Sequence, residues 1–185
     1  MQRESPTTVT AHGVNLRNPT VAAVLAWLWP GGGHFYQRRY FKGTLFMCLI
    51  LVTFFYGLAL ADGRAVYAQW TPQHKRYNYL PQVAVGLPAL PALVEARRAR
   101  AGAEPLLGGW YAPPRDADEL NEIHRRYHRY FELGTVYTMI AGLLNVLVIY
   151  DAWGGPAYVR EDDQEEEKAK RGEKDGPPAD SKPPP

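Results

Sequence analysis

Four stretches of this chain run for eighteen residues or more without a single Asp, Glu, Lys or Arg: residues 18–37, 43–61, 77–94 and 133–150. A hydrocarbon layer of about 30 Å takes roughly 20 helical residues to cross, so each stretch is long enough to form a transmembrane helix. Because 22% of the residues are charged, composition alone does not explain four such stretches. The pattern predicts an all-α integral membrane helical bundle with four transmembrane helices, at about residues 19–37, 43–61, 77–94 and 133–151.

The second and fourth stretches give the clearest signal. Residues 43–61 are dense in Leu, Ile, Val and Phe, and they leave no polar face for water. Residues 133–150 lie between two acidic residues, and the Gly154-Gly155 pair predicts the end of that helix.

The first stretch, residues 19–37, is less regular. Asn18 can cap the helix, and Pro19 suits the first helical position, where no N–H is needed. Pro30 and the glycines after it weaken the helix near its far end. A cleaved signal peptide is the alternative, but the leader is long and no Ala-x-Ala site follows.

The third stretch, residues 77–94, contains Pro81, Gly86, Pro88 and Pro91. Prolines are tolerated in membrane helices where neighbouring groups satisfy the freed carbonyls. The alternative is a re-entrant or interfacial segment, which would leave three spans.

The basic residues of the loops favour four spans. Ten of them then share one side of the membrane, whereas the leader and the opposite loop hold five. The ten are Arg38, Arg39, Lys42, Arg97, Arg98, Arg100, Arg115, Arg125, Arg126 and Arg129. The positive-inside rule places both termini outside, and we expect a bacterial cytoplasmic membrane.

The most distinctive local sequence joins the first two stretches through a very short turn. The residues of this hairpin-loop motif are Gly31, Gly33, His34, Tyr36, Lys42 and Gly43. Over residues 19–61 the motif resembles the two-transmembrane hairpin domain family, and this resemblance implies architecture rather than catalysis. Residues 18–156 as a whole are similar to an uncharacterised family of bacterial membrane proteins built on that hairpin.

His34 within this motif has two interpretations. It could be a proton-sensitive or ligand-binding group at the membrane edge. We predict the other, a turn residue that hydrogen-bonds backbone groups exposed by the glycines.

Residues 116–132 predict one interfacial amphipathic helix. Asp116 can cap it, and Glu119 lies three residues later, as in a capping box. Its apolar stripe is Leu120, Ile123, Tyr127, Tyr130 and Phe131. Its basic side, Arg125, Arg126 and Arg129, is typical of contact with anionic lipid headgroups.

The same helix suggests a metal site as an alternative. His124, His128 and Glu132 are spaced so that three potential ligands would stack on one face. The glutamate of the zinc-protease motif is missing, and the neighbouring arginines oppose cation binding. We therefore predict no metal and no cofactor.

The last stretch carries a helix-packing seam of small and polar residues: Gly134, Thr138, Gly142 and Asn145. Such a seam lets helices approach closely and hydrogen-bond, in one chain, with a membrane-protein partner or in a homo-oligomer. The alternative is a substrate or ion path that uses Asn145 and Asp151. We expect Asp151 to meet water, Arg17 or Arg64.

These patterns predict a polar leader over residues 1–17, a transmembrane domain over 18–156 and a disordered, charged, Pro-rich tail over 157–185. The net charge of +2 does not indicate a nucleic-acid partner, and the lone Cys48 excludes a disulfide framework within the chain. No phosphate-binding loop or nucleophile elbow is present. We expect a non-enzymatic scaffold or interaction protein. The alternatives are a small oligomeric transporter or channel subunit and a metal-dependent membrane enzyme.

Overall fold

The computed structural model describes residues 10–11, 14–15, 18–70 and 76–155. The tail over 157–185 lies outside these residues, as does most of the leader. In chain order the elements are β1 (Thr10–Ala11), β2 (Val14–Asn15), α1 (Pro19–Leu28), α2 (Gly32–Tyr36), α3 (Tyr40–Leu60), α4 (Tyr79–Val83), the 3-10 helix η1 (Leu87–Ala89), α5 (Pro91–Arg100), α6 (Ala117–Tyr127) and α7 (Arg129–Gly154). Apart from the short β1–β2 pairing, the regular structure is helical, which confirms the all-α prediction for the described residues.

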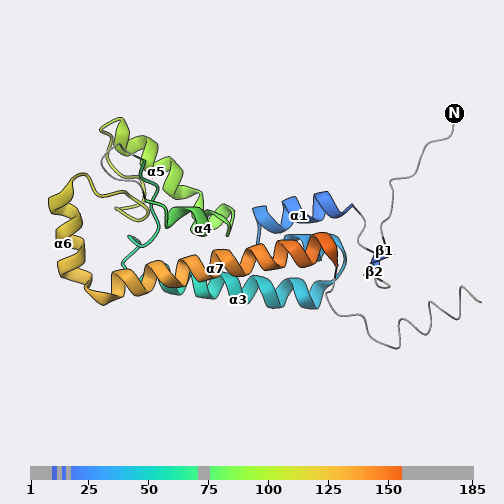
Figure 1. Cartoon of the computed structure of the whole chain (residues 1–185). Helices are drawn as coiled ribbons and strands as arrows, with labels where there is room; N and C mark the ends of the chain where they lie inside the picture. The colour runs from blue at the N-terminus through green and yellow to red at the C-terminus, as the bar shows by residue number, and fades with distance from the viewer. Residues whose placement is uncertain (1–9, 12–13, 16–17, 71–75, 156–185) are drawn as a thin grey trace, which may run out of the picture.

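The two longest helices, α3 and α7, pack side by side and form the long axis of the molecule (Figure 1). They run antiparallel, because Gly57 near the end of α3 contacts Gly134 near the start of α7, and Arg39 before α3 pairs with Asp151 near the end of α7. A Cβ atom on Gly57 or Gly134 would overlap the facing helix, so these glycines let the two backbones approach closely. Among the described residues, α3 and α7 are the helices long and apolar enough to cross a membrane.

The first predicted span is not one helix. α1 ends ahead of Pro30, and Gly31 then turns the chain with a positive φ of 79°. α2 folds back along α1, so that the Gly33 backbone lies against the Ala22 carbonyl and the Ala152 side chain. Residues 19–37 therefore enter and leave at the same end of the bundle, the end where α7 stops.

The third predicted span is also divided. Gly86 turns the chain between α4 and η1 with a φ of 88°, and the Tyr79 hydroxyl on one arm donates to the Ala89 carbonyl on the other at 3.1 Å. The segment thus approaches the middle of α7 and returns, so residues 77–94 do not form one continuous helix. The four-span count is not confirmed, since the described chain has two long helices and two segments that turn back. We call these two, residues 19–37 and 77–94, the folded-back segments.

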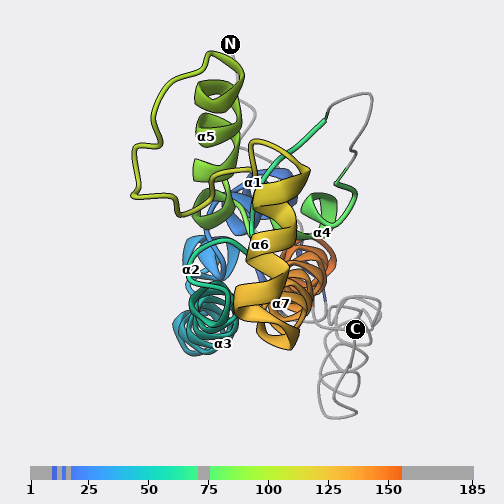
Figure 2. The same ribbon diagram turned by 90° about the vertical axis from the view of Figure 1, so that its left-hand side faces the viewer.

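The remaining helices, α5 and α6, gather at the end where α3 stops and α7 begins (Figures 1 and 2). We call residues 61–70 and 91–128 the cap. Asp116 caps α6 by accepting the Glu119 N–H at 2.7 Å, as predicted. α6 stops at Tyr127, because His128 has a φ of 45°, so the predicted helix over 116–132 is divided between α6 and α7.

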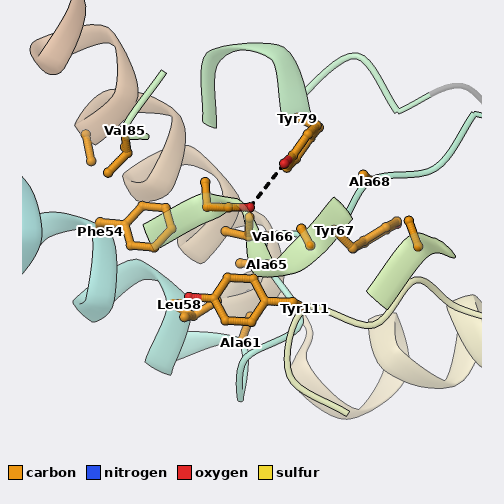
Figure 3. Close-up of a cluster of buried hydrophobic side chains, with 14 of the residues drawn as sticks. Phe54, Leu58, Ala61, Ala65, Val66, Tyr67, Ala68, Tyr79, Val85 and Tyr111 are labelled. Carbon is orange, nitrogen blue, oxygen red and sulfur yellow. Dashed lines mark hydrogen bonds between the residues drawn. The ribbon is translucent and has the colours of Figure 1, made fainter. Parts of the chain in front are cut away.

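A hydrophobic cluster joins the cap to the end of α3 (Figure 3). Phe54 and Leu58 of α3 are fully buried, and Val66 and Tyr111 of the cap are packed into the same cluster. Burying aliphatic and aromatic side chains at about 25 cal/mol per Å² gives the cap its anchor on the long helices.

Candidate functional site

The middle of the bundle is organised around one side chain, Asn145 of α7. Its amide nitrogen donates to the Ala26 carbonyl at 3.1 Å and to the Ala84 carbonyl at 2.8 Å. Each carbonyl lies four residues before a proline, Pro30 or Pro88, which has no N–H to give it. Because Asn145 is fully buried, its two amide hydrogens satisfy carbonyls that the ends of α1 and α4 leave without helical donors.

The glycines around this junction make close approach possible. A Cβ atom on Gly142 would overlap the Pro81 carbonyl of α4, and one on Gly86 would overlap the Trp27 carbonyl of α1. The tips of the two folded-back segments therefore meet each other and α7 at the level of Asn145.

All four residues of the predicted helix-packing seam are buried within this single chain. Gly134 faces α3, Thr138 accepts a hydrogen bond from Gln82 of α4, and Gly142 and Asn145 face the folded-back segments. An oligomer formed through this seam would require the folded-back segments to move away from α7. If the folded-back segments remain in place, an oligomer would have to form through another surface.

A second polar cluster lies between Asn145 and the cap. Gln82 is fully buried and donates to the Thr138 hydroxyl at 2.8 Å and to the Ala65 carbonyl at 3.1 Å. Arg76 donates to the same carbonyl at 2.9 Å and to the Thr135 hydroxyl at 3.2 Å. These contacts fasten the chain that follows α3 onto the first turns of α7.

Arg76 also stacks on an aromatic ring. Its guanidinium lies 3.9 Å from the centre of the Tyr67 ring and donates to the Tyr67 hydroxyl at 2.8 Å. Burial lowers the pKa of Arg76, and the adjacent Tyr67 opposes that change. Burial likewise raises the pKa of Tyr67, with Arg76 acting in the opposite direction. The cluster therefore holds the Arg76 guanidinium against uncharged oxygen atoms and the face of the Tyr67 ring.

The third polar cluster lies at the opposite end of α7. The Nε2 atom of His34 lies 2.7 Å from Oδ2 of Asp151, and the His34 ring is fully buried. Arg39 donates to the same oxygen at 3.1 Å, and Lys42 Nζ lies 3.6 Å from Oδ1. Gln37 donates to the Ala152 carbonyl at 2.6 Å, so the hairpin loop is tied to the end of α7 by side chains.

These partners differ from the predicted ones. We expected His34 to bond turn backbone, and Asp151 to meet water, Arg17 or Arg64. Arg64 lies in the cap, where it pairs with Glu119 at 3.0 Å, and Arg17 lies outside the described residues. The prediction for His34 was wrong, and so was Arg64 as a partner of Asp151, because the fold-back of α2, which brings His34 to Asp151, leaves no mark in local sequence. Asp151 is 22% exposed, so its contact with water stays a prediction.

The two glycines before and after the turn, Gly31 and Gly43, and Tyr36 of the hairpin-loop motif are closely packed. A Cβ atom on Gly31 would overlap the Gly43 carbonyl, and one on Gly43 would press on the Phe35 ring. Tyr36 is half-buried and packs against the small cluster around Ala152. The motif therefore sets the path from α2 into α3.

The predicted lipid-contact arginines, Arg125, Arg126 and Arg129, are all exposed, at the end of α6 and the start of α7. The metal alternative used the stack of His124, His128 and Glu132, which the bend at His128 divides. His124 instead places Nδ1 2.8 Å from the Leu120 carbonyl. Within the described ranges no three His, Cys, Asp or Glu side chains are grouped to hold a metal ion.

The sequence reasoning missed Gln82, Arg76 and the double role of Asn145. One signal was available for Asn145: each folded-back segment contains a proline, which lacks an N–H, and a buried amide can supply two donors. No local signal marks Arg76, whose partners come from the chain after α3 and from α7.

Comparison with known proteins gives a family but no activity. A family of unknown function (DUF6677) matches residues 21–165, which include all the described helices apart from the first two residues of α1. No curated protein matches the chain, and no solved structure does. The match is consistent with the predicted membership of an uncharacterised family, and the chain belongs to the DUF6677 family of unknown function.

Proposed function

We propose that this protein is a non-enzymatic integral membrane protein that acts as a scaffold or interaction partner, with α3 and α7 crossing the bilayer. The observation that carries this proposal is how little of either helix the protein covers: 28% of the apolar window of α3 and 39% of that of α7 are buried. A core helix of a water-soluble protein is covered on most sides. The large apolar side chains left exposed include Leu45, Leu49, Val52, Phe55, Val136, Ile140, Leu143 and Leu147.

Aromatic side chains at both ends of the pair support the same placement. Tyr40, Phe41 and Trp153 are exposed at one end, and Tyr77 and Tyr130 are exposed at the other. Aromatic rings favour the headgroup level on each side of a bilayer.

The charges support one orientation. The cap and the start of α7 hold most of the arginines, so the positive-inside rule puts this end in the cytoplasm and residues 18 and 155 outside. At the opposite end, Asp151 pairs with Arg39 and Lys42 and so reduces the competing positive charge. In this orientation Arg125, Arg126 and Arg129 would contact anionic headgroups.

Two measurements test the proposal. Alkaline carbonate should leave the chain in the membrane pellet, because two apolar helices cannot be extracted by charge and pH alone. A reporter inserted at Gly102, in the cap, should be active only in the cytoplasm, and one at the C-terminus only outside. Extraction into the carbonate supernatant contradicts membrane residence, whereas reporters active in the reverse compartments contradict only the orientation.

One observation favours the transporter alternative. Gln82 Oε1 and Asn145 Oδ1 are buried and accept no hydrogen bond from any described residue. A water-filled path would satisfy them. Asn145→Cys, in a Cys48→Ser background, separates the two functions: reaction with water-soluble thiol reagents supports a path, and lasting protection supports packing. The background is needed because Cys48 is exposed.

A further inference from the structure

The cap forms a cavity of about 800 Å³ that is open to solvent on one side. It lies between the chain that follows α3, one face of α5 and the loop over residues 101–116 that arches from α5 to α6. Many of its lining residues are Ala, Gly or Pro, whose small side chains do not fill the space between the elements. The volume is within the range of small-molecule sites.

The arch is held in place by buried and partly buried contacts. Glu95 of α5 is 2% exposed, and its Oε1 accepts the backbone N–H groups of Leu106 at 3.0 Å and Leu107 at 3.3 Å. Tyr111 donates its N–H to the Gly63 carbonyl at 2.8 Å. Because these bonds fix both sides of the arch, the cavity is a built feature of the cap.

The carboxylates that line the cavity are already engaged. Glu119 accepts from the Arg64 guanidinium at 3.0 Å and from the Arg115 backbone at 2.8 Å. Glu104 pairs with Arg115 at 3.4 Å, and Glu95 holds the arch. These three carboxylates therefore already accept hydrogen bonds from donors within the protein.

The guanidinium groups, in contrast, keep spare donors. Each guanidinium carries five N–H donors. Arg64 and Arg115 each use one of their side-chain nitrogens in a hydrogen bond with a described residue. Arg100, at the end of α5, makes no ion pair or hydrogen bond with any described residue. Most of the hydrogen-bonding groups left unused in the cavity are therefore guanidinium N–H donors. A ligand that matches them must be rich in acceptors.

We propose that this cavity binds a phosphate-bearing ligand through Arg64, Arg100 and Arg115. A phosphate group presents three strong acceptor oxygens, more than a carboxylate, and guanidinium groups bind it through paired N–H donors. Arg64 lies just past the end of α3, so the phosphate can belong to a lipid headgroup at the membrane surface or to a soluble ester. The headgroup source rests on the membrane proposal above, whereas the soluble ester does not.

The test uses the full chain in dodecyl maltoside micelles, whose headgroup carries no phosphate. One arm titrates glycerol 3-phosphate by calorimetry, with glycerol as the uncharged control. The other arm adds phosphatidic acid to the micelles and measures its enrichment on the purified protein. Saturable binding in the first arm identifies a soluble ester, and enrichment in the second without binding in the first identifies a headgroup.

Variants decide whether the cavity is responsible. Arg100→Gln should weaken binding by about tenfold or more, because it removes charge-assisted hydrogen bonds. Arg97→Gln, on the same helix and also exposed but outside the cavity lining, should change binding by less than about twofold. Arg115→Gln gives an independent loss if Arg100→Gln lowers the helix content. Absence of binding in both arms, or equal losses in Arg97→Gln and Arg100→Gln, overturns the proposal, whatever the carbonate extraction shows.

Discussion

His34 and Asp151 are 117 residues apart in sequence, and their side chains lie 2.7 Å apart at the end of α7. His34 is fully buried and Asp151 is 22% exposed, so the pair lies at a boundary between protein interior and solvent. The contact closes the α1–α2 fold-back onto α7. It gives the histidine of the hairpin-loop motif a structural role that involves a partner outside the motif.

Removing the carboxylate should loosen this end of the bundle. Asp151→Ala leaves His34 buried without its partner and frees Arg39, so we expect the free energy of unfolding in mixed micelles to fall by about 1–3 kcal/mol. Lys42→Gln is the control, because that side chain is 41% exposed and lies 3.6 Å from the carboxylate. Its effect should stay within about 1 kcal/mol. Equal losses in the two variants contradict a specific His34–Asp151 bond.

Truncating Asn145 should destabilise both folded-back segments together. Asn145→Ala leaves the Ala26 and Ala84 carbonyls without donors in an apolar interior, at a cost of about 1–3 kcal/mol in the free energy of unfolding. Asn121→Ala, on the exposed face of α6, is the matched control and should change it by less than about 0.5 kcal/mol. Disulfide cross-linking of cysteine pairs, one cysteine at the turn of each folded-back segment, can report whether the two turns separate in Asn145→Ala. Unchanged stability in Asn145→Ala means that the two carbonyls find other donors.

The close approach at Gly142 predicts intolerance of even one methyl group. Gly142→Ala places a Cβ atom onto the Pro81 carbonyl, so we expect a loss of about 1–3 kcal/mol or more in the free energy of unfolding. Gly154→Ala is on the same helix, and its Cβ would meet only the Tyr150 ring at 4.0 Å. It should be neutral or slightly stabilising. A wild-type unfolding curve for Gly142→Ala would mean that α4 does not contact α7 there.

Tyr111 predicts a loss of stability at high pH. Burial raises its pKa from 10.0 to about 12, so the folded state favours the protonated phenol. The unfolded chain ionises first as pH rises, and the stabilisation present below pH 10 should be lost between pH 10 and about 12. Tyr111→Phe should lose about 1–2 kcal/mol less over this window than wild type. Parallel unfolding free energies in the two proteins would show that Tyr111 ionises normally.

Local sequence was enough to predict two helix starts and one helix end. Asn18 accepts the N–H groups of Thr20 and Val21 at the start of α1, as a helix cap should. Asp116 caps α6, and α7 stops at the Gly154-Gly155 pair. The apolar runs also located the two long helices, α3 and α7, to within a few residues. These features depend on groups within one or two helical turns, so the sequence alone determines them.

The path of the proline-containing stretches was decided by tertiary structure. A run of apolar residues with prolines has the same composition whether it crosses the bundle or turns back. The outcome depends on donors for the freed carbonyls, which Asn145 supplies to Ala26 and Ala84, and on space for the backbone, which Gly142 supplies. The polar clusters at His34 and Arg76 depend on the same long-range contacts. Thus the sequence by itself determined the all-α class, the two long apolar helices and the caps at Asn18 and Asp116. Only the tertiary structure decided which apolar stretches span the bundle, because that choice is made by side chains distant in sequence.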